Sequence, residues 1–220
     1  NWNGSSVSVL LGSGLGTFGP QSEIAVGANP RDVEVGDLNG DGHADLVTAN
    51  MGTNTVSVLL GTGSGTFQPR TDIVSGGHPS GVAIGDLNND WHPDLAVSNQ
   101  HAVGMDNVPG TASVMLGTGT GSFGPRTDYP SGATTRAVAV ADLDGDGALD
   151  LVVANWQVNT ISVRRGSGKG TFGQRFDYGT QRSPTWVTVA DLDGDHRPDV
   201  VIPDAWSDAI TMWFGQAPVP

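Results

Sequence analysis

The stretch Asp37-Leu-Asn-Gly-Asp-Gly-His-Ala-Asp45 decides the fold, because the chain repeats its pattern three more times. The other copies start at Asp86, Asp142 and Asp191, so successive copies are 49, 56 and 49 residues apart. Each copy has the form D-x-[DN]-x-D-x-x-x-D. Similarity within one chain at a period of about 20–50 residues is typical of solenoids and propellers. We therefore predict that the chain is built from one repeated unit.

Each acidic stretch lies between runs that are typical of β-strands. An alternating run such as Val33-Glu-Val35 precedes it, and an apolar run such as Leu151-Val-Val153 follows it. A third run, a glycine-rich turn ending in Gly-Thr-Phe, and a fourth run complete the unit. Four strands in about 50 residues make one propeller blade. No window has apolar residues at helical spacing. We therefore expect an all-β fold with almost no helix, a β-propeller of four-stranded blades with four repeats of about 49 residues.

The repeats divide a single domain, residues 1–220, into one partial blade and four further units. Residues 1–24 supply third and fourth strands only, and the repeats start near residues 31, 80, 136 and 185. The longest interval contains a seven-residue insertion (56 − 49) near Gln100–Gly110. The last repeat lacks a fourth strand, which the N-terminal strands are able to supply. A closed four-bladed ring and an arc of a larger propeller both remain possible.

The acidic stretches are predicted to bind up to four structural Ca²⁺ ions. Oxygen-bearing side chains occupy positions 1, 3, 5 and 9, and a backbone carbonyl at position 7 adds a fifth ligand. Calcium takes about six to eight hard oxygen ligands, whereas zinc prefers His or Cys and magnesium prefers strict octahedra. An Asp-rich turn without a metal is the alternative. The candidate ligands are Asp37, Asn39, Asp41, His43, Asp45, Asp86, Asn88, Asp90, His92, Asp94, Asp142, Asp144, Asp146, Ala148, Asp150, Asp191, Asp193, Asp195, Arg197 and Asp199.

Position 6 differs among the four loops. It is Gly42 or Gly147 in the first and third loops, but Trp91 or His196 in the second and fourth. A left-handed backbone costs a residue other than glycine roughly 1–2 kcal/mol. We therefore expect weaker metal binding in the second and fourth loops.

The acidic loops, the Leu-Val-Val-Ala-Asn155 strand and the Gly-Thr-Phe turns resemble the FG-GAP/VCBS repeat family, the blade repeat of integrin-α-like propellers. The resemblance covers essentially the whole chain. It implies a calcium-binding propeller with ligands at Asp37, Asn39, Asp41, Asp45 and the matching residues of the later loops. Some relatives with this repeat bind sugars, others bind proteins, and some polysaccharide lyases resemble this propeller class.

The location of the charge excludes one class of partner. Net charge is −13, and 14 of the 23 acidic residues lie in the four loops, which leaves nine acids (23 − 14) against ten Lys and Arg. A nucleic-acid partner needs a basic face, so none is expected. No apolar run is long enough to span a membrane, so no membrane insertion is expected. Cytosolic calcium is too low to fill weak sites, so a secreted, extracellular protein is expected, in which calcium replaces the disulfides that a chain without cysteine lacks.

A ligand is expected on the face opposite the acidic loops. Strands in a blade alternate in direction, so the loops between second and third strands share a face with the links between blades. Tryptophans in those loops and arginines near those links suit sugar rings, which stack on aromatic faces and accept hydrogen bonds. Filling of gaps between blades is the alternative role for the tryptophans. The candidate ligand-binding residues are Trp2, Trp156, Trp206, Arg31, Arg136 and Arg182.

Three functions are compatible with these features. The first is a calcium-stabilised binding module, lectin-like or adhesive, whose partner is a glycan or an extracellular protein. The second is a structural unit of a larger secreted protein, with a possible homo-oligomer formed through the incomplete end blades. The third is an enzyme resembling a polysaccharide lyase. No catalytic set of acids, histidines or nucleophiles stands out, so we expect a protein that is not an enzyme.

Overall fold

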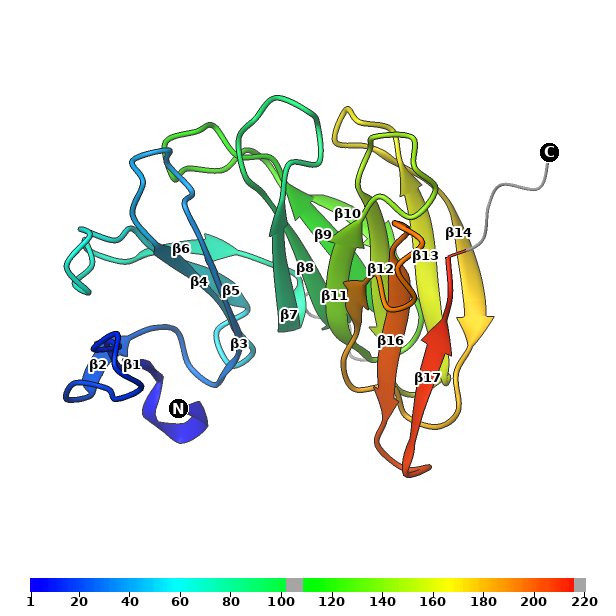
Figure 1. The fold of residues 1–220 in the computed structure, drawn as a ribbon, viewed down its shortest axis with the longest axis horizontal. Helices are drawn as coiled ribbons and strands as arrows, with labels where there is room; N and C mark the ends of the chain where they lie inside the picture. The colour runs from blue at the N-terminus through cyan, green and yellow to red at the C-terminus, as the bar shows by residue number, and fades with distance from the viewer. Residues whose placement is uncertain (102–108, 216–220) are drawn as a thin grey trace.

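The computed structural model describes residues 1–101 and 109–215, and most of the insertion predicted near Gln100–Gly110 lies outside them. In these residues the only helix is the three-residue 3-10 helix η1 (Trp2–Gly4), which confirms the expected all-β class. No helix in this part of the chain is long and apolar enough to cross a membrane. The strands form a row of antiparallel sheets arranged as blades along an arc (Figure 1).

Three blades have four strands each, paired in the order of the sequence, as the repeat predicts. Within a blade, each short loop joins two neighbouring strands of one sheet, so the connections need no crossover. The first blade comprises β3 (Pro30–Gly36), β4 (Asp45–Asn50), β5 (Thr55–Leu59) and β6 (Thr71–Val74). The second comprises β7 (Gly77–Gly85), β8 (Asp94–His101), β9 (Thr111–Met115) and β10 (Thr127–Pro130). The third comprises β11 (Thr135–Ala141), β12 (Asp150–Asn155), β13 (Thr160–Gly166) and β14 (Phe172–Gly179).

The two ends of the described chain carry smaller sheets. At the N-terminal end, β1 (Ser6–Val9) pairs only with β2 (Ser22–Ala25). At the other end, β15 (Thr188–Ala190), β16 (Asp199–Asp204) and β17 (Ala209–Trp213) form three strands. The N-terminal strands do not complete the last blade, because Val7 and Val26 pack against the first blade instead. The described part of the molecule is therefore an arc, with β1 and β17 at its opposite ends (Figure 1).

The core lies between neighbouring blades. The second strands β4 and β12 are buried along their whole length, which explains why they read as continuous apolar runs. Val47 and Val56 of the first blade pack with Val97 of the second, and similar clusters join the second to the third blade and the third to the last sheet. Each blade therefore buries its faces against its neighbours, and no blade has a separate core.

A buried polar chain inside each complete blade explains the asparagine that ends each second strand. In the third blade, Asn155 donates to the hydroxyl of Ser162 at 2.8 Å, and Ser162 donates to Asp177 at 2.7 Å. The side-chain oxygen of Asn155 accepts the backbone N–H of Gly132 in the incoming link. A Cβ at Gly132 would lie 2.5 Å from the Asn155 side chain, so only glycine fits this close approach. Asn50 and Asn99 occupy the same place in the other complete blades.

The loops divide between the two edges of the arc, as the alternation of strand direction requires. The acidic loops and the Gly-Thr-Phe turns share the first edge, where the N–H of Gly121 donates to the carbonyl of Leu38 in the preceding blade. The loops between second and third strands share the second edge with the links, where the N–H of Trp156 donates to the carbonyl of Thr134. We call these the acidic-loop face and the tryptophan face. They form the upper and lower edges of the arc in Figure 1.

Candidate calcium loops and the tryptophan face

The first aspartate of each acidic loop shapes the loop by accepting backbone hydrogen bonds. In the third loop, Asp142 accepts the N–H groups of Gly145, Asp146 and Gly147 at 2.8–3.1 Å. One carboxylate therefore folds the next five residues around itself, in the manner of an extended Asx turn. Asp37 forms the corresponding bonds in the first loop. The predicted pattern thus specifies a local conformation as well as a set of oxygen atoms.

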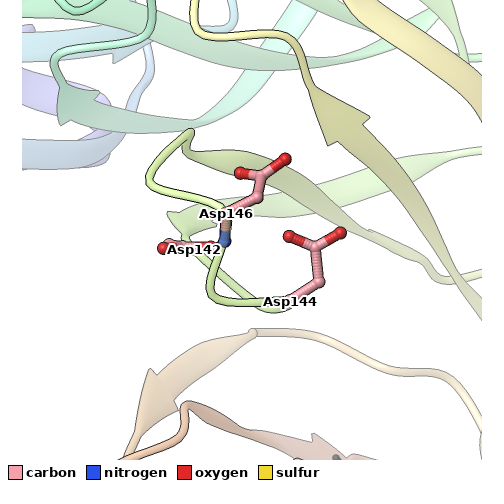
Figure 2. Close-up of side chains that lie close together, drawn as sticks. All are labelled: Asp142, Asp144 and Asp146. Atoms are coloured by element: carbon pink, nitrogen blue, oxygen red, sulfur yellow. Dashed lines mark hydrogen bonds between the residues drawn. The ribbon is translucent and has the colours of Figure 1, made fainter. Parts of the chain in front are cut away.

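This conformation brings carboxylates together in the third and fourth loops. Each of Asp142, Asp144 and Asp146 contributes an oxygen atom to a group whose members all lie within 4.8 Å of one another (Figure 2). Asp191, Asp193 and Asp195 form the same group. In the first and second loops, position 3 is an asparagine whose amide donates to the position-5 aspartate at 2.8–3.0 Å. Crowded hard oxygen atoms are the donor set that Ca²⁺ prefers, so the residues present fit the ion.

Backbone N–H groups keep several of these carboxylates ionised. The N–H of Gly42 is the main cause that lowers the pKa of Asp37, and the N–H of Gly194 does the same for Asp191. The pKa of Asp90 is lowered mainly by the N–H of His92. Hydrogen bonds to the charged form favour that form. The loops therefore present anionic oxygen atoms to a cation at neutral pH.

The ninth position of each loop has a structural role that the sequence analysis missed. Asp94 is fully buried, and its two carboxylate oxygens accept the N–H of Leu87 at 2.8 Å and the N–H of Gly117 at 2.6 Å. The same pair of bonds, at 2.6–3.0 Å, recurs at Asp45, Asp150 and Asp199. The ninth aspartate therefore ties the acidic loop to the start of the turn that follows the third strand. In the third and fourth loops it lies outside the group of closely spaced oxygens.

Burial has an electrostatic consequence at this position. Desolvation raises the pKa of Asp94 and of Asp150, and the neighbouring loop carboxylates raise each pKa further. A bound cation would offset both effects, because it favours the ionised form. At position 7, the residue whose backbone carbonyl is the predicted metal ligand donates its own backbone N–H to the position-5 aspartate, at 2.8–2.9 Å. These residues are His43, His92, Ala148 and Arg197.

The tryptophan face pairs two of the three predicted tryptophans with arginines. The guanidinium carbon of Arg31 lies 4.4 Å from the ring centroid of Trp2, and that of Arg136 lies 5.1 Å from the ring of Trp156. Trp206 is 66% exposed, and its backbone N–H donates to the carbonyl of Arg182 at 3.4 Å. The structure thus brings Trp2 to Arg31 and Trp156 to Arg136 through their side chains, whereas Trp206 meets Arg182 through the backbone.

A family model for the FG-GAP-like repeat matches four segments, residues 1–48, 37–97, 102–153 and 142–202, which form two overlapping pairs. The chain belongs to the FG-GAP-like repeat family. Each match includes at least one of the acidic loops described above, and together the matches cover most of the sequence. No curated protein matches the chain.

Solved structures place these FG-GAP repeats among propeller-like folds. A lectin from Agrocybe aegerita, described as recognising non-reducing terminal N-acetylglucosamine, is similar with a TM-score of 0.60 at 20% identity. The match covers 96% of this chain and 60% of the lectin. BBS1N, solved in complex with ARL6DN, is similar with a TM-score of 0.51 at 16% identity, over 80% of this chain and 47% of its own. At these identities the likeness establishes the fold alone.

The second FG-GAP loop has a strained residue at position 6. Trp91 has φ 69°, and His196 has φ 66°, close to the values of 81° and 86° at Gly42 and Gly147. The left-handed conformation expected at position 6 is therefore present in all four loops, and two of them adopt it with a side chain. Trp91 is also 92% exposed, so its ring gains little from packing.

Replacing Trp91 with glycine is expected to stabilise the folded protein by about 1 kcal/mol, because the left-handed strain disappears and almost no contact is lost. Urea unfolding at fixed calcium concentration measures this change. Trp91→Ala is the matched control, since it removes the ring but keeps the Cβ that causes the strain. If Trp91→Gly were no more stable than Trp91→Ala, strain at position 6 would not limit this loop.

Proposed function

We propose that this chain is a calcium-stabilised binding module that holds a glycan on its tryptophan face. One observation carries the proposal: two indoles on one face each make a cation-π contact with an arginine. These pairs are Trp2 with Arg31 and Trp156 with Arg136. Aromatic faces stack on sugar rings, and guanidinium N–H groups donate to hydroxyls and ring substituents. Trp206, which is 66% exposed, adds a third indole on the same edge of the arc. The proposed role is recognition without a chemical reaction.

Calcium supports this role by stabilising the acidic-loop face, which lies opposite the proposed ligand. The crowded carboxylates repel one another, and a divalent cation removes this repulsion. At an extracellular calcium concentration of about 1 mM, a site with a dissociation constant near 10 µM adds about 2.7 kcal/mol. Such sites would be nearly empty in the cytosol, so we propose that the protein works outside the cell.

A glycan array on the calcium-loaded protein tests the proposal. Trp156→Ala is expected to weaken binding of a recognised glycan at least about tenfold, because a buried aromatic contact is a typical hot spot. Trp91→Ala is the matched control, since it removes an exposed indole from the acidic-loop face. It should leave binding unchanged.

Two outcomes would contradict the proposal. If a folded, calcium-loaded protein binds no glycan, the ligand is not a sugar, and an extracellular protein becomes the partner to test. If Trp91→Ala abolishes binding while Trp156→Ala does not, a glycan is bound but on the opposite face. Circular dichroism of each variant checks that the loss of binding does not come from unfolding.

A further inference from the structure

Three neighbouring blades carry a β-bulge at the same place, near the start of the innermost strand. The pairing registers shift between Pro30 and Asp32 in β3, between Pro79 and Gly81 in β7, and between Thr135 and Ala137 in β11. The unpaired extra residues are therefore Arg31, Ser80 and Arg136. A bulge turns its extra residue out of the ladder and re-aims the side chain. Because β7 contacts both β3 and β11, the strand that carries the serine lies between the strands that carry the two arginines (Figure 1).

The two bulged arginines lack a carboxylate partner among residues 1–101 and 109–215. The neighbouring carboxylate of Asp32 accepts the N–H groups of Val33 and Val82 at 2.9 Å. Three other arginines, one in each complete blade, pair with an aspartate two residues later at 2.9–3.1 Å, and these pairs are Arg70–Asp72, Arg126–Asp128 and Arg175–Asp177. Within the described residues, Arg31 and Arg136 thus have no ion-pair partner, although the chain has a net charge of −13.

Arg136 is partly buried, and its guanidinium interacts electrostatically with that of Arg31, whose side chain is exposed. Burial lowers the pKa of Arg136, and the positive charge of Arg31 lowers it further. The Nε atom of Arg136 is buried and has no hydrogen-bond partner. A buried charged donor without a partner costs free energy, and repulsion between like charges adds to that cost. An anion placed between the two arginines would remove both penalties.

The geometry also indicates the shape of the anion. The central carbon of each guanidinium lies over an indole, and a guanidinium also offers N–H donors along its edge. The edge of a guanidinium matches a carboxylate, which accepts two parallel hydrogen bonds. Ser80 is small and buried, and its hydroxyl donates to the carbonyl of Thr135 at 2.9 Å.

We infer that the tryptophan face recognises an acidic saccharide, whose carboxylate lies between Arg31 and Arg136 and whose ring stacks on Trp2 or Trp156. This inference rests on the proposed glycan-binding function and adds the charge of the ligand. The arginines supply charge selectivity, and the indoles supply affinity for the sugar ring. The carboxylate compensates two positive charges that no acidic side chain of the described protein compensates.

The test compares three probes by calorimetry with the calcium-loaded protein: a disaccharide ending in glucuronic acid, its methyl ester and the glucose analogue. The acid should bind about 10- to 100-fold more tightly than the ester or the neutral sugar, because hydrogen bonds to charged groups are the stronger ones. In the double variant Arg31→Gln/Arg136→Gln this preference should disappear while weak binding of the neutral sugar remains. Lys169→Gln, an exposed change on the acidic-loop face, should keep the full preference.

The outcomes separate this inference from the function on which it rests. Equal affinity of the unaltered protein for the acid and its methyl ester would overturn the inference and leave glycan binding intact. A preference that survives in the double variant would also overturn it, because other groups would then bind the carboxylate. Binding of a sulfated disaccharide but not of the glucuronate would reject the carboxylate as the recognised group. Failure to bind any saccharide would overturn the proposed function together with the inference.

Discussion

Chelation of calcium is expected to lower the midpoint of thermal unfolding by about 10–20 °C. Two sites of about 2.7 kcal/mol each, filled at about 1 mM calcium, give this shift in a domain of about 200 residues. The physical reason lies in the third and fourth loops, where three carboxylates each contribute an oxygen to a group within 4.8 Å. Without a cation these carboxylates repel one another, and the loops lose a partner that only the folded state binds. Differential scanning calorimetry with calcium and with EDTA measures the shift.

Two controls make this result specific. Magnesium at the same concentration should restore less of the lost stability, because it requires a stricter octahedral geometry. Asp193→Asn gives the fourth loop the same position-3 residue as the first two loops, Asn39 and Asn88. This variant should reduce the calcium-dependent shift, and in EDTA it should raise the midpoint slightly, because one of three mutually repelling charges is removed. An unfolding midpoint that EDTA does not change would show that the loops do not bind calcium in the folded protein.

Loss of a buried ninth-position aspartate is expected to destabilise the protein even without calcium. Asp94→Ala removes the acceptor of two backbone N–H groups, those of Leu87 and Gly117, in a fully buried place. Each buried donor left without a partner costs about 1–3 kcal/mol, so a total loss of about 2–5 kcal/mol is expected. Urea unfolding in EDTA measures this loss separately from any effect on metal binding.

The matched control is Asp90→Ala in the same loop, because Asp90 is exposed and its removal leaves no buried donor without a partner. In EDTA it should cost less than about 1 kcal/mol, whereas in calcium it should weaken the ion's contribution. Asp94→Asn should fall between the two, since its amide retains one acceptor oxygen. If Asp94→Ala were no worse than Asp90→Ala in EDTA, the tie between the loop and the following turn would not contribute to stability.

Much of the fold and part of the site were predictable because they depend on residues that are close in the sequence. Each of these features depends on residues within one repeat. Examples are the alternation in Val33–Val35, the apolar run in Leu151–Val153 and the acidic loop that joins two such strands. The left-handed backbone at Trp91 was predictable for the same reason, since a tight turn of this type requires it at position 6. The aspartates of positions 1, 3 and 5 are brought together by bonds that span five residues or fewer.

The ninth-position aspartates show where this reasoning fails. They belong to the same repeated pattern as the other acidic positions. The pattern alone therefore predicts one role for all of them, that of metal ligand. The structure gives Asp150 two partners, Leu143 within the loop and Gly166 at the end of β13. The second partner becomes a neighbour only when β12 and β13 are paired. No local pattern distinguishes an aspartate that faces solvent from one that is buried beneath the loop.

The amino-acid sequence by itself determined the repeat, the four-stranded blade and the four acidic loops, because these arise from contacts within about 50 residues. Only the tertiary structure decided that the described blades form an arc, because this depends on which blade Val7 and Val26 pack against. It also decided that Arg31 and Arg136, 105 residues apart in the chain, act on each other's charge. The bulges arise from strand pairing within each blade, whereas the packing of blades that places both arginines on one face arises from contacts between repeats.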